Sequence, residues 1–142
     1  MILKPKDTIL KSYRLAVKTL QKNYSETGIL AGKNHFSDLW IRDACFSIWG
    51  SLELNDFKIV KHSLKTILKE INKDGQVPLR YGAYIFLFKF IGLPTKNQPR
   101  YIEDKGFSIP TDSNSLFLIA LEKYCSKTND LSLITEHTQT IQ

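Results

Sequence analysis

An aromatic ring, a guanidinium and a carboxylate occur within four residues of the sequence, at Trp40, Arg42 and Asp43. Sugar recognition uses these groups, because the apolar C–H face of a pyranose packs on indole while its hydroxyls need hydrogen-bond donors and acceptors. In a purely structural alternative, Asp43 caps a helix and pairs with Arg42 above a buried Trp40. Taken alone, the segment is compatible with either interpretation.

The segment stands at the entrance to a predicted helix. Asp43 is a suitable N-cap, and the residues that follow are apolar on most sides, so we expect this helix to be buried. Apolar periodicity predicts five helices. The first begins after Asp7 or Thr8 and ends near Gln21, the second runs from Asp43 to Leu54, and the third runs from Phe57 to a stop at Lys73–Gly75. The fourth follows Asp112 and Ser113, and the fifth begins at Leu131. Surface and buried helices alternate in this series, which predicts an all-α array of antiparallel helical hairpins.

Two segments between the helices lack a helical period. Residues 25–36 contain two glycines and are predicted as a loop, and residues 76–110 contain four prolines and are predicted as a long connection. Within the second segment, aromatic residues alternate from Tyr84 to Phe90. That alternation fits a short strand or hairpin, and a helical turn is the alternative.

Composition limits the class of protein. The chain has 142 residues, 42% of them hydrophobic and 24% charged, which is typical of a folded domain. The net charge of +6 is spread along the chain. One basic stripe recurs at helical spacing at Lys58, Lys61, Lys65 and Lys69, so a helical nucleic-acid-binding protein is an alternative. We favour a solvated helix face and predict no nucleic-acid partner.

Other chemistries lack the residues that they need. The stretch 28–34 lacks the glycine spacing and the magnesium-binding hydroxyl of a phosphate loop, and the three histidines are scattered, so no cofactor and no metal are predicted. Cys45 and Cys125 have no redox or metal spacing and are expected to be small buried side chains. The apolar run 81–93 is too short to span a bilayer, and no secretory leader is evident. We therefore expect a cytoplasmic chain without a membrane partner.

Three short motifs resemble those of one enzyme superfamily. Residues 40–43 resemble the W-x-R-D motif of glucoamylase-like enzymes and of the amylo-α-1,6-glucosidase part of glycogen-debranching enzymes. Residues 74–81, Asp-Gly-Gln-Val-Pro-Leu-Arg-Tyr, resemble its D-G-x-[IV]-P-x-[RK]-[YF] loop, and residues 112–119 resemble its D-x-x-x-L-[WF]-x-[IV] helix entry. The order and spacing of the motifs agree with this six-hairpin glycosidase superfamily. One departure is Asp38-Leu39, where many relatives carry an aromatic residue.

The resemblance implies a fold and a site. The fold is an (α/α)6 toroid of twelve helices in two layers, of which residues 1–142 supply a single partial domain, the N-terminal third of an incomplete barrel. The residues implied to surround the sugar of the non-reducing end are Trp40, Arg42 and Asp43, with Arg80 and Asp112 nearby and Tyr81 as a wall. An oligosaccharide is therefore the expected ligand.

The same resemblance implies a divided function. The chain is expected to be the N-terminal segment of a glycoside hydrolase that acts on α-linked glucan or related oligosaccharides, with the general acid and base beyond Gln142. Asp43 and Asp112 are predicted at helix N-termini, where a carboxylate is favoured in its ionised form, so they should accept hydrogen bonds rather than donate protons. No residue of the isolated chain is assigned as catalytic.

One alternative and two kinds of partner follow from this division. A non-catalytic helical module that binds carbohydrate or a partner is the main alternative to an enzyme segment. An incomplete barrel would also expose apolar helix faces, and these are expected to contact a complementing C-terminal chain or a second copy of the protein.

Overall fold

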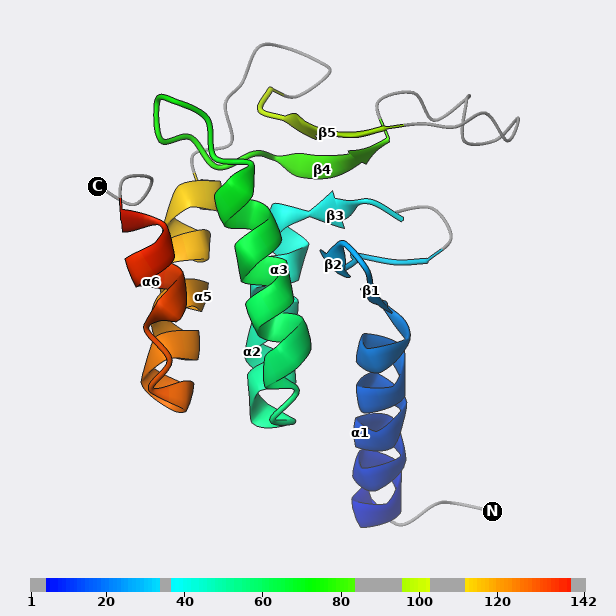
Figure 1. Cartoon of the computed structure of the whole chain (residues 1–142). Helices are drawn as coiled ribbons and strands as arrows, with labels where there is room; N and C mark the ends of the chain where they lie inside the picture. The colour runs from blue at the N-terminus through cyan, green and yellow to red at the C-terminus, as the bar shows by residue number, and fades with distance from the viewer. Residues whose placement is uncertain (1–4, 34–36, 84–95, 103–111, 139–142) are drawn as a thin grey trace.

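The computed structural model describes residues 5–33, 37–83, 96–102 and 112–138 (Figure 1). Its helices are α1 (Pro5–Lys22), α2 (Ile41–Glu53), α3 (Phe57–Lys69), α5 (Asp112–Thr128) and α6 (Ser132–Glu136). Its strands are β1 (Tyr24–Ser25), β2 (Gly28–Ile29), β3 (Leu39–Trp40), β4 (Arg80–Ala83) and β5 (Asn97–Arg100). The alternating segment from Tyr84 to Phe90 lies outside the described residues.

The all-α prediction is wrong. Of the described residues, 61% are helical and 13% lie in strands, which form two small antiparallel sheets. One sheet is the β1–β2 hairpin, and the other has the order β3-β4-β5. Strands of two to four residues are too short to show a period in the sequence, and β4 and β5 fall in the segment that was predicted as an irregular connection. The chain is therefore mixed α/β, not a purely helical array.

α2 and α5 lie side by side and run in the same direction. The Arg42 guanidinium in the first turn of α2 pairs with the Asp112 carboxylate at the start of α5. At the other end of the same helices, Glu53 pairs with Lys127 at 2.9 Å. Figure 1 shows α3 returning antiparallel in front of α2, and α6 folding back along α5. The N-termini of α2 and α5 therefore meet at the end of the molecule that carries the β3–β4–β5 sheet.

Asparagines make the tight connections within both helix pairs. Asn55, between α2 and α3, has a φ of 59°, and Asn129, between α5 and α6, has a φ of 54°. Among residues with a side chain, asparagine tolerates this left-handed conformation best, because its short amide can bond to the local backbone. The local sequence thus reverses the chain at both positions.

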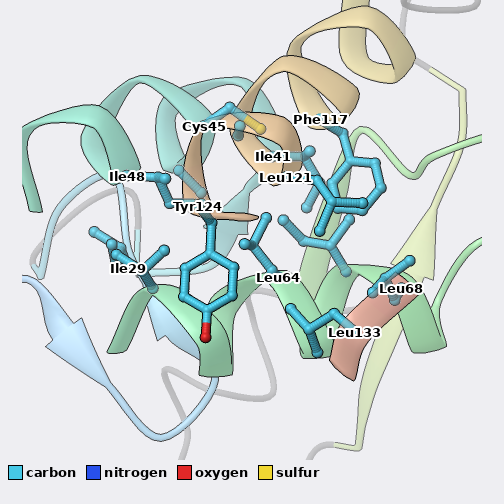
Figure 2. Close-up of a cluster of buried hydrophobic side chains, with 14 of the residues drawn as sticks. Ile29, Ile41, Cys45, Ile48, Leu64, Leu68, Phe117, Leu121, Tyr124 and Leu133 are labelled. Carbon is cyan, nitrogen blue, oxygen red and sulfur yellow. The ribbon is translucent and has the colours of Figure 1, made fainter. Parts of the chain in front are cut away.

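The core lies between α2, α3, α5 and the β1–β2 hairpin (Figure 2). Its fully buried side chains include Ile41 and Ile48 from α2, Leu64 from α3 and Phe117 from α5. Cys45 also lies in this core, and burial raises the pKa of its thiol to about 12. Both cysteines are buried and unpaired, so the prediction that they are small buried side chains is confirmed.

The boundary of α2 differs from the prediction. The helix begins at Ile41, its N-cap is Trp40, and Asp43 stands inside the first turn rather than at the cap. No side chain caps this end, and the backbone N–H of Ile41 donates instead to the carbonyl of Leu79 at 3.1 Å. Leu79, which precedes β4 and is distant in the sequence, supplies an acceptor for this helix end, so no local sequence signal marks the start.

The first helix projects from the body. The predicted apolar stripe is present, but Ile9 and Tyr13 are 70% and 58% exposed, and only its end near Leu20 packs on the core. In Figure 1, the N-terminal part of α1 extends beyond the ends of α2 and α3. The prediction of a helix here is confirmed, while most of its apolar face remains uncovered within the described chain.

A matched pair of leucines tests the position of the core. Leu64 is fully buried, whereas Leu15 on α1 is 65% exposed. Leu64→Ala should lower the free energy of unfolding by about 2–5 kcal/mol, because it leaves a cavity among packed side chains. Leu15→Ala should change it by less than about 0.5 kcal/mol. Urea unfolding followed by circular dichroism measures both, and equal effects would contradict this packing.

Candidate functional site

The first and second motif segments meet as neighbouring strands. Trp40 in β3 pairs directly with Arg80 in β4, and Leu39 pairs with Tyr81. The Arg80 guanidinium lies over the Trp40 ring, 5.7 Å from its centroid, which is a cation–π contact. Residues 40 positions apart in the chain therefore form one joined surface.

The second and third segments are joined by one amide side chain. Asn114 Nδ2 donates to the carbonyl of Gly75 at 2.9 Å, and Asn114 Oδ1 accepts from the backbone N–H of Val77 at 2.9 Å. Both groups belong to an irregular loop that has no ladder to satisfy them. The first turn of α5 thus fixes the loop that leads into β4.

An ion pair joins the first and third segments. Arg42 Nε lies 2.7 Å from Asp112 Oδ2, and Arg42 Nη2 donates to Asp112 Oδ1 at 3.0 Å. The two side chains are 49% and 44% exposed, so the pair adds only about 0–1 kcal/mol to stability. Its bidentate geometry nevertheless orients a guanidinium and a carboxylate side by side at the surface. All three motif segments are therefore in mutual contact.

A second and more buried ion pair supports Arg80. Asp38 Oδ2 accepts from Arg80 Nη1 at 2.8 Å, and the side chains are only 21% and 16% exposed. The carboxylate offsets the positive charge that Arg80 and its cross-strand neighbour Arg100 bring together. Asp38 thus holds the guanidinium in place over Trp40.

Gly82 makes room for that carboxylate. The β3–β4 register places Gly82 opposite Asp38, and a Cβ atom at Gly82 would overlap the Asp38 side chain. Any larger residue would force Asp38 away from Arg80. Gly82 therefore supports the site by leaving space for the Asp38 side chain.

The remaining two predicted residues lie in different surroundings. Asp43 is exposed in the first turn of α2, and no described residue forms a hydrogen bond or ion pair with its carboxylate. Tyr81 follows Arg80 in β4, so it points to the opposite face of the sheet. There it lines a hollow of about 420 Å³ that also includes residues of the β1–β2 hairpin. Burial, and then the nearby Glu70 carboxylate, raise the pKa of Tyr81 above its ordinary value.

The structure thus places all six predicted residues at one end of the molecule, but Tyr81 points to the face of the sheet opposite to Arg80. Sequence reasoning did not assign roles to Asp38, Gly82 and Asn114. Asp38 was visible only as a departure from the family motif, and Asn114 only as an unassigned position within the third motif. Within the described ranges, no group of three or more metal-binding side chains is found.

Comparison with known proteins gives no match. No family model, no curated protein and no solved structure with which the chain was compared is similar to it. None of the helices in the described part of the chain is long and apolar enough to cross a membrane. The site is therefore interpreted from its own geometry and from the motif resemblance.

A pair of glycines tests the site's architecture. Gly82→Ala should break the Asp38–Arg80 pair and lower the free energy of unfolding by about 1–3 kcal/mol, because it introduces overlap at a half-buried charge pair. Gly32→Ala is the control, since no atom lies within 4 Å of its added Cβ. Urea unfolding followed by tryptophan fluorescence measures the difference. If both variants match the wild type, Asp38 does not need the space at Gly82.

Proposed function

We propose that this chain supplies the sugar-binding residues of a glycoside hydrolase that acts on α-linked glucan or related oligosaccharides. Arg42, Asp43 and Asp112 contact the hydroxyls of the non-reducing-end sugar, and Trp40 with Arg80 forms the adjoining wall. The general acid and base come from a complementing polypeptide. The chain itself binds the sugar without hydrolysing it.

One observation carries the proposal. Three motif segments that are distant in the sequence, and that resemble one glycosidase superfamily in the same order, meet through the β3–β4 pairing, the Asn114 amide and the Arg42–Asp112 pair. A chance resemblance of three short motifs gives no reason for the segments to contact one another. Their meeting therefore favours a shared site.

The geometry of the Arg42–Asp112 pair suits neighbouring sugar hydroxyls. The two contacts to Asp112 use Nε and Nη2 of the guanidinium, which leaves further N–H groups able to donate, and a carboxylate oxygen can accept more than one hydrogen bond. Both side chains are about half exposed, so a hydroxyl can reach them. The exposed Asp43 carboxylate adds an acceptor from the same turn of α2.

Trp40 takes part differently from what the sequence indicated. One face of its indole is covered by Arg80, so a sugar ring cannot stack on that face. In the proposed site the sugar uses the opposite face or the indole edge, and Arg80 stiffens the ring from behind. The sequence predicted that the Trp40 indole stacks on the sugar ring, and in the proposed site it only borders the sugar.

The assigned carboxylates suit binding better than acid–base catalysis. Asp112 is held by the Arg42 guanidinium at the start of α5, and Asp43 stands exposed in the first turn of α2. A general acid needs surroundings that keep it protonated. In the proposal, the carboxyl groups that perform hydrolysis come from another polypeptide segment.

The basic stripe on α3 gains no support as a nucleic-acid site. Lys61 donates to Asp130 and Ser132, and Lys65 pairs with Glu136, so half of the stripe is engaged in holding α6. Phosphate binding would have to compete with these intramolecular partners.

Calorimetric titration with maltotriose tests the proposal. Binding by the wild-type chain should be saturable and weak, with a dissociation constant on the order of 1 mM, because only part of the subsite is present. Arg42→Ala and Asp43→Ala should each weaken binding at least about tenfold, since each removes charge-assisted hydrogen bonds to sugar hydroxyls.

Glu53→Ala is the matched control. It removes the ion pair that joins α2 to α5 at the opposite end from Arg42 and Asp112, so it should leave binding unchanged. A folded wild-type chain that does not bind maltotriose, maltose or another α-linked disaccharide would refute the proposal. Equal losses in Glu53→Ala and Arg42→Ala would also contradict it.

A further inference from the structure

The projecting helix α1 carries a continuous apolar face, which we call the α1 stripe. It consists of side chains that recur at helical spacing: Ile9, Leu10, Tyr13, Ala16, Val17 and Leu20. Ile9 is 70% exposed and Tyr13 is 58% exposed, and only the end near Leu20 packs on the core. The exposed apolar groups therefore form one side of a regular helix and are not scattered over the surface.

The side of α1 away from the stripe is basic. α1 has five basic residues and one acidic residue, a net charge of +4. The cations on the side away from the stripe are Lys11, Arg14, Lys18 and Lys22. Within the described ranges, none of these four forms a salt bridge, whereas Lys61 and Lys65 on α3 pair with Asp130 and Glu136. The positive charge of α1 is therefore accessible to an anion from outside the chain.

The body holds α1 at its C-terminal end. Gln21 Nε2 donates to Asp56 Oδ2 at 3.1 Å, and the hydroxyl of Tyr24, just after the helix, donates to the same oxygen at 2.8 Å. A Cβ atom at Gly50 would lie 3.1 Å from the Leu20 side chain, so the glycine lets α1 pack closely on α2. The N-terminal part of the helix extends beyond the ends of α2 and α3 (Figure 1). The first turns of the stripe can therefore contact a flat surface.

The two faces of α1 together indicate what covers them. An apolar stripe opposite a lysine- and arginine-rich face is typical of helices that lie in the plane of a membrane surface. The apolar side chains enter the boundary between headgroups and acyl chains, while long basic side chains reach the anionic headgroups. Tyr13 suits that boundary, because its ring is apolar and its hydroxyl is polar.

Other occupants satisfy only one of the two faces. A soluble polyanion such as nucleic acid would neutralise the cations and leave the stripe in water. A second copy of the chain would cover the stripe but bring together two helices that each carry a net charge of +4. An anionic lipid surface covers the stripe and neutralises the cations at the same time.

We propose that α1 lies along an anionic lipid surface, with the α1 stripe in the boundary between headgroups and acyl chains. The sequence predicted no membrane partner because its apolar run is too short to cross a bilayer, but a helix that lies on the surface does not need to cross it. A helix of this length is marginally stable in water on its own, so the lipid would also stabilise α1. The proposal rests on α1 alone and does not depend on sugar binding.

Vesicle flotation with the full chain tests the proposal. The wild type should bind phosphatidylcholine vesicles that contain about 30% phosphatidylserine at least about tenfold more tightly than vesicles of phosphatidylcholine alone. Raising the salt concentration to about 1 M should reduce that difference, because salt screens the attraction between lysines and headgroups.

Two substitutions on α1 separate the contributions of its faces. Ile9→Asp should lower binding to the anionic vesicles at least about tenfold, because it places a charge in the stripe. Lys18→Glu should also lower it at least about tenfold, because it replaces an attraction to the headgroups by a repulsion. Both side chains are exposed, so the fold should tolerate the changes.

Leu118→Asp on α5 and Lys58→Glu on α3 are the matched controls. They make the same changes of charge and polarity at exposed residues outside α1. Both should bind the anionic vesicles within about twofold of the wild type. Losses as large as those of the α1 variants would overturn the proposal, because binding would then not depend on α1.

Three further outcomes would also overturn the proposal. The first is a wild-type chain that does not float with the anionic vesicles, or that binds the neutral vesicles equally well. The second is a chain that binds a duplex oligonucleotide instead, with a loss in Lys18→Glu and none in Ile9→Asp, since this assigns the basic face to a soluble polyanion. The third is a dimer in sedimentation velocity that Ile9→Asp abolishes, without vesicle binding, since this assigns the stripe to a second copy.

Discussion

The parallel packing of α2 and α5 is the constraint on which the rest of the structure depends. Two neighbouring helices that run in the same direction bring their positive ends together and leave the N–H groups of both first turns to be satisfied at one place. In the described chain, the carbonyl of Leu79 accepts from the N–H of Ile41, and Asp43 and Asp112 stand in the two first turns, near the positive ends of both helices. The β3–β4–β5 sheet lies at the same end. A surface with carboxylates, guanidiniums and an indole follows from that packing.

The same packing divides the molecule into a covered and an uncovered side. α3, α6 and the β1–β2 hairpin bury one side of the pair, where Cys45, Phe117 and Tyr124 form the core. Phe46 on α2 and Leu118 on α5 are each 50% exposed.

Local patterns in the sequence predicted the positions of the helices but not the contacts between them. Apolar periodicity located the five described helices to within a few residues, because apolar side chains recur at helical spacing along them, although most of that stripe on α1 is exposed. It could not show that a carbonyl 38 residues away starts α2, or that Arg42 pairs with Asp112 rather than with its neighbour Asp43. The sequence pattern also did not predict the strands, because segments of two to four residues acquire their conformation from partners that are distant in the sequence. Family resemblance supplied the site residues, while the supporting roles of Asp38 and Gly82 came from the register of β3 against β4.

The central claim is that three motif segments form one sugar-binding surface, and a nitrogen–proton correlation spectrum of the labelled chain titrated with maltotriose tests it most directly. The chain has two indole N–H signals, from Trp40 inside the proposed site and from Trp49 outside it. The account predicts saturable shifts of the Trp40 indole and of the backbone amides of Arg42, Arg80 and Asp112, with one common dissociation constant and an unmoved Trp49 indole. Shifts confined to one segment, shifts centred on Trp49, or an unchanged spectrum would contradict it.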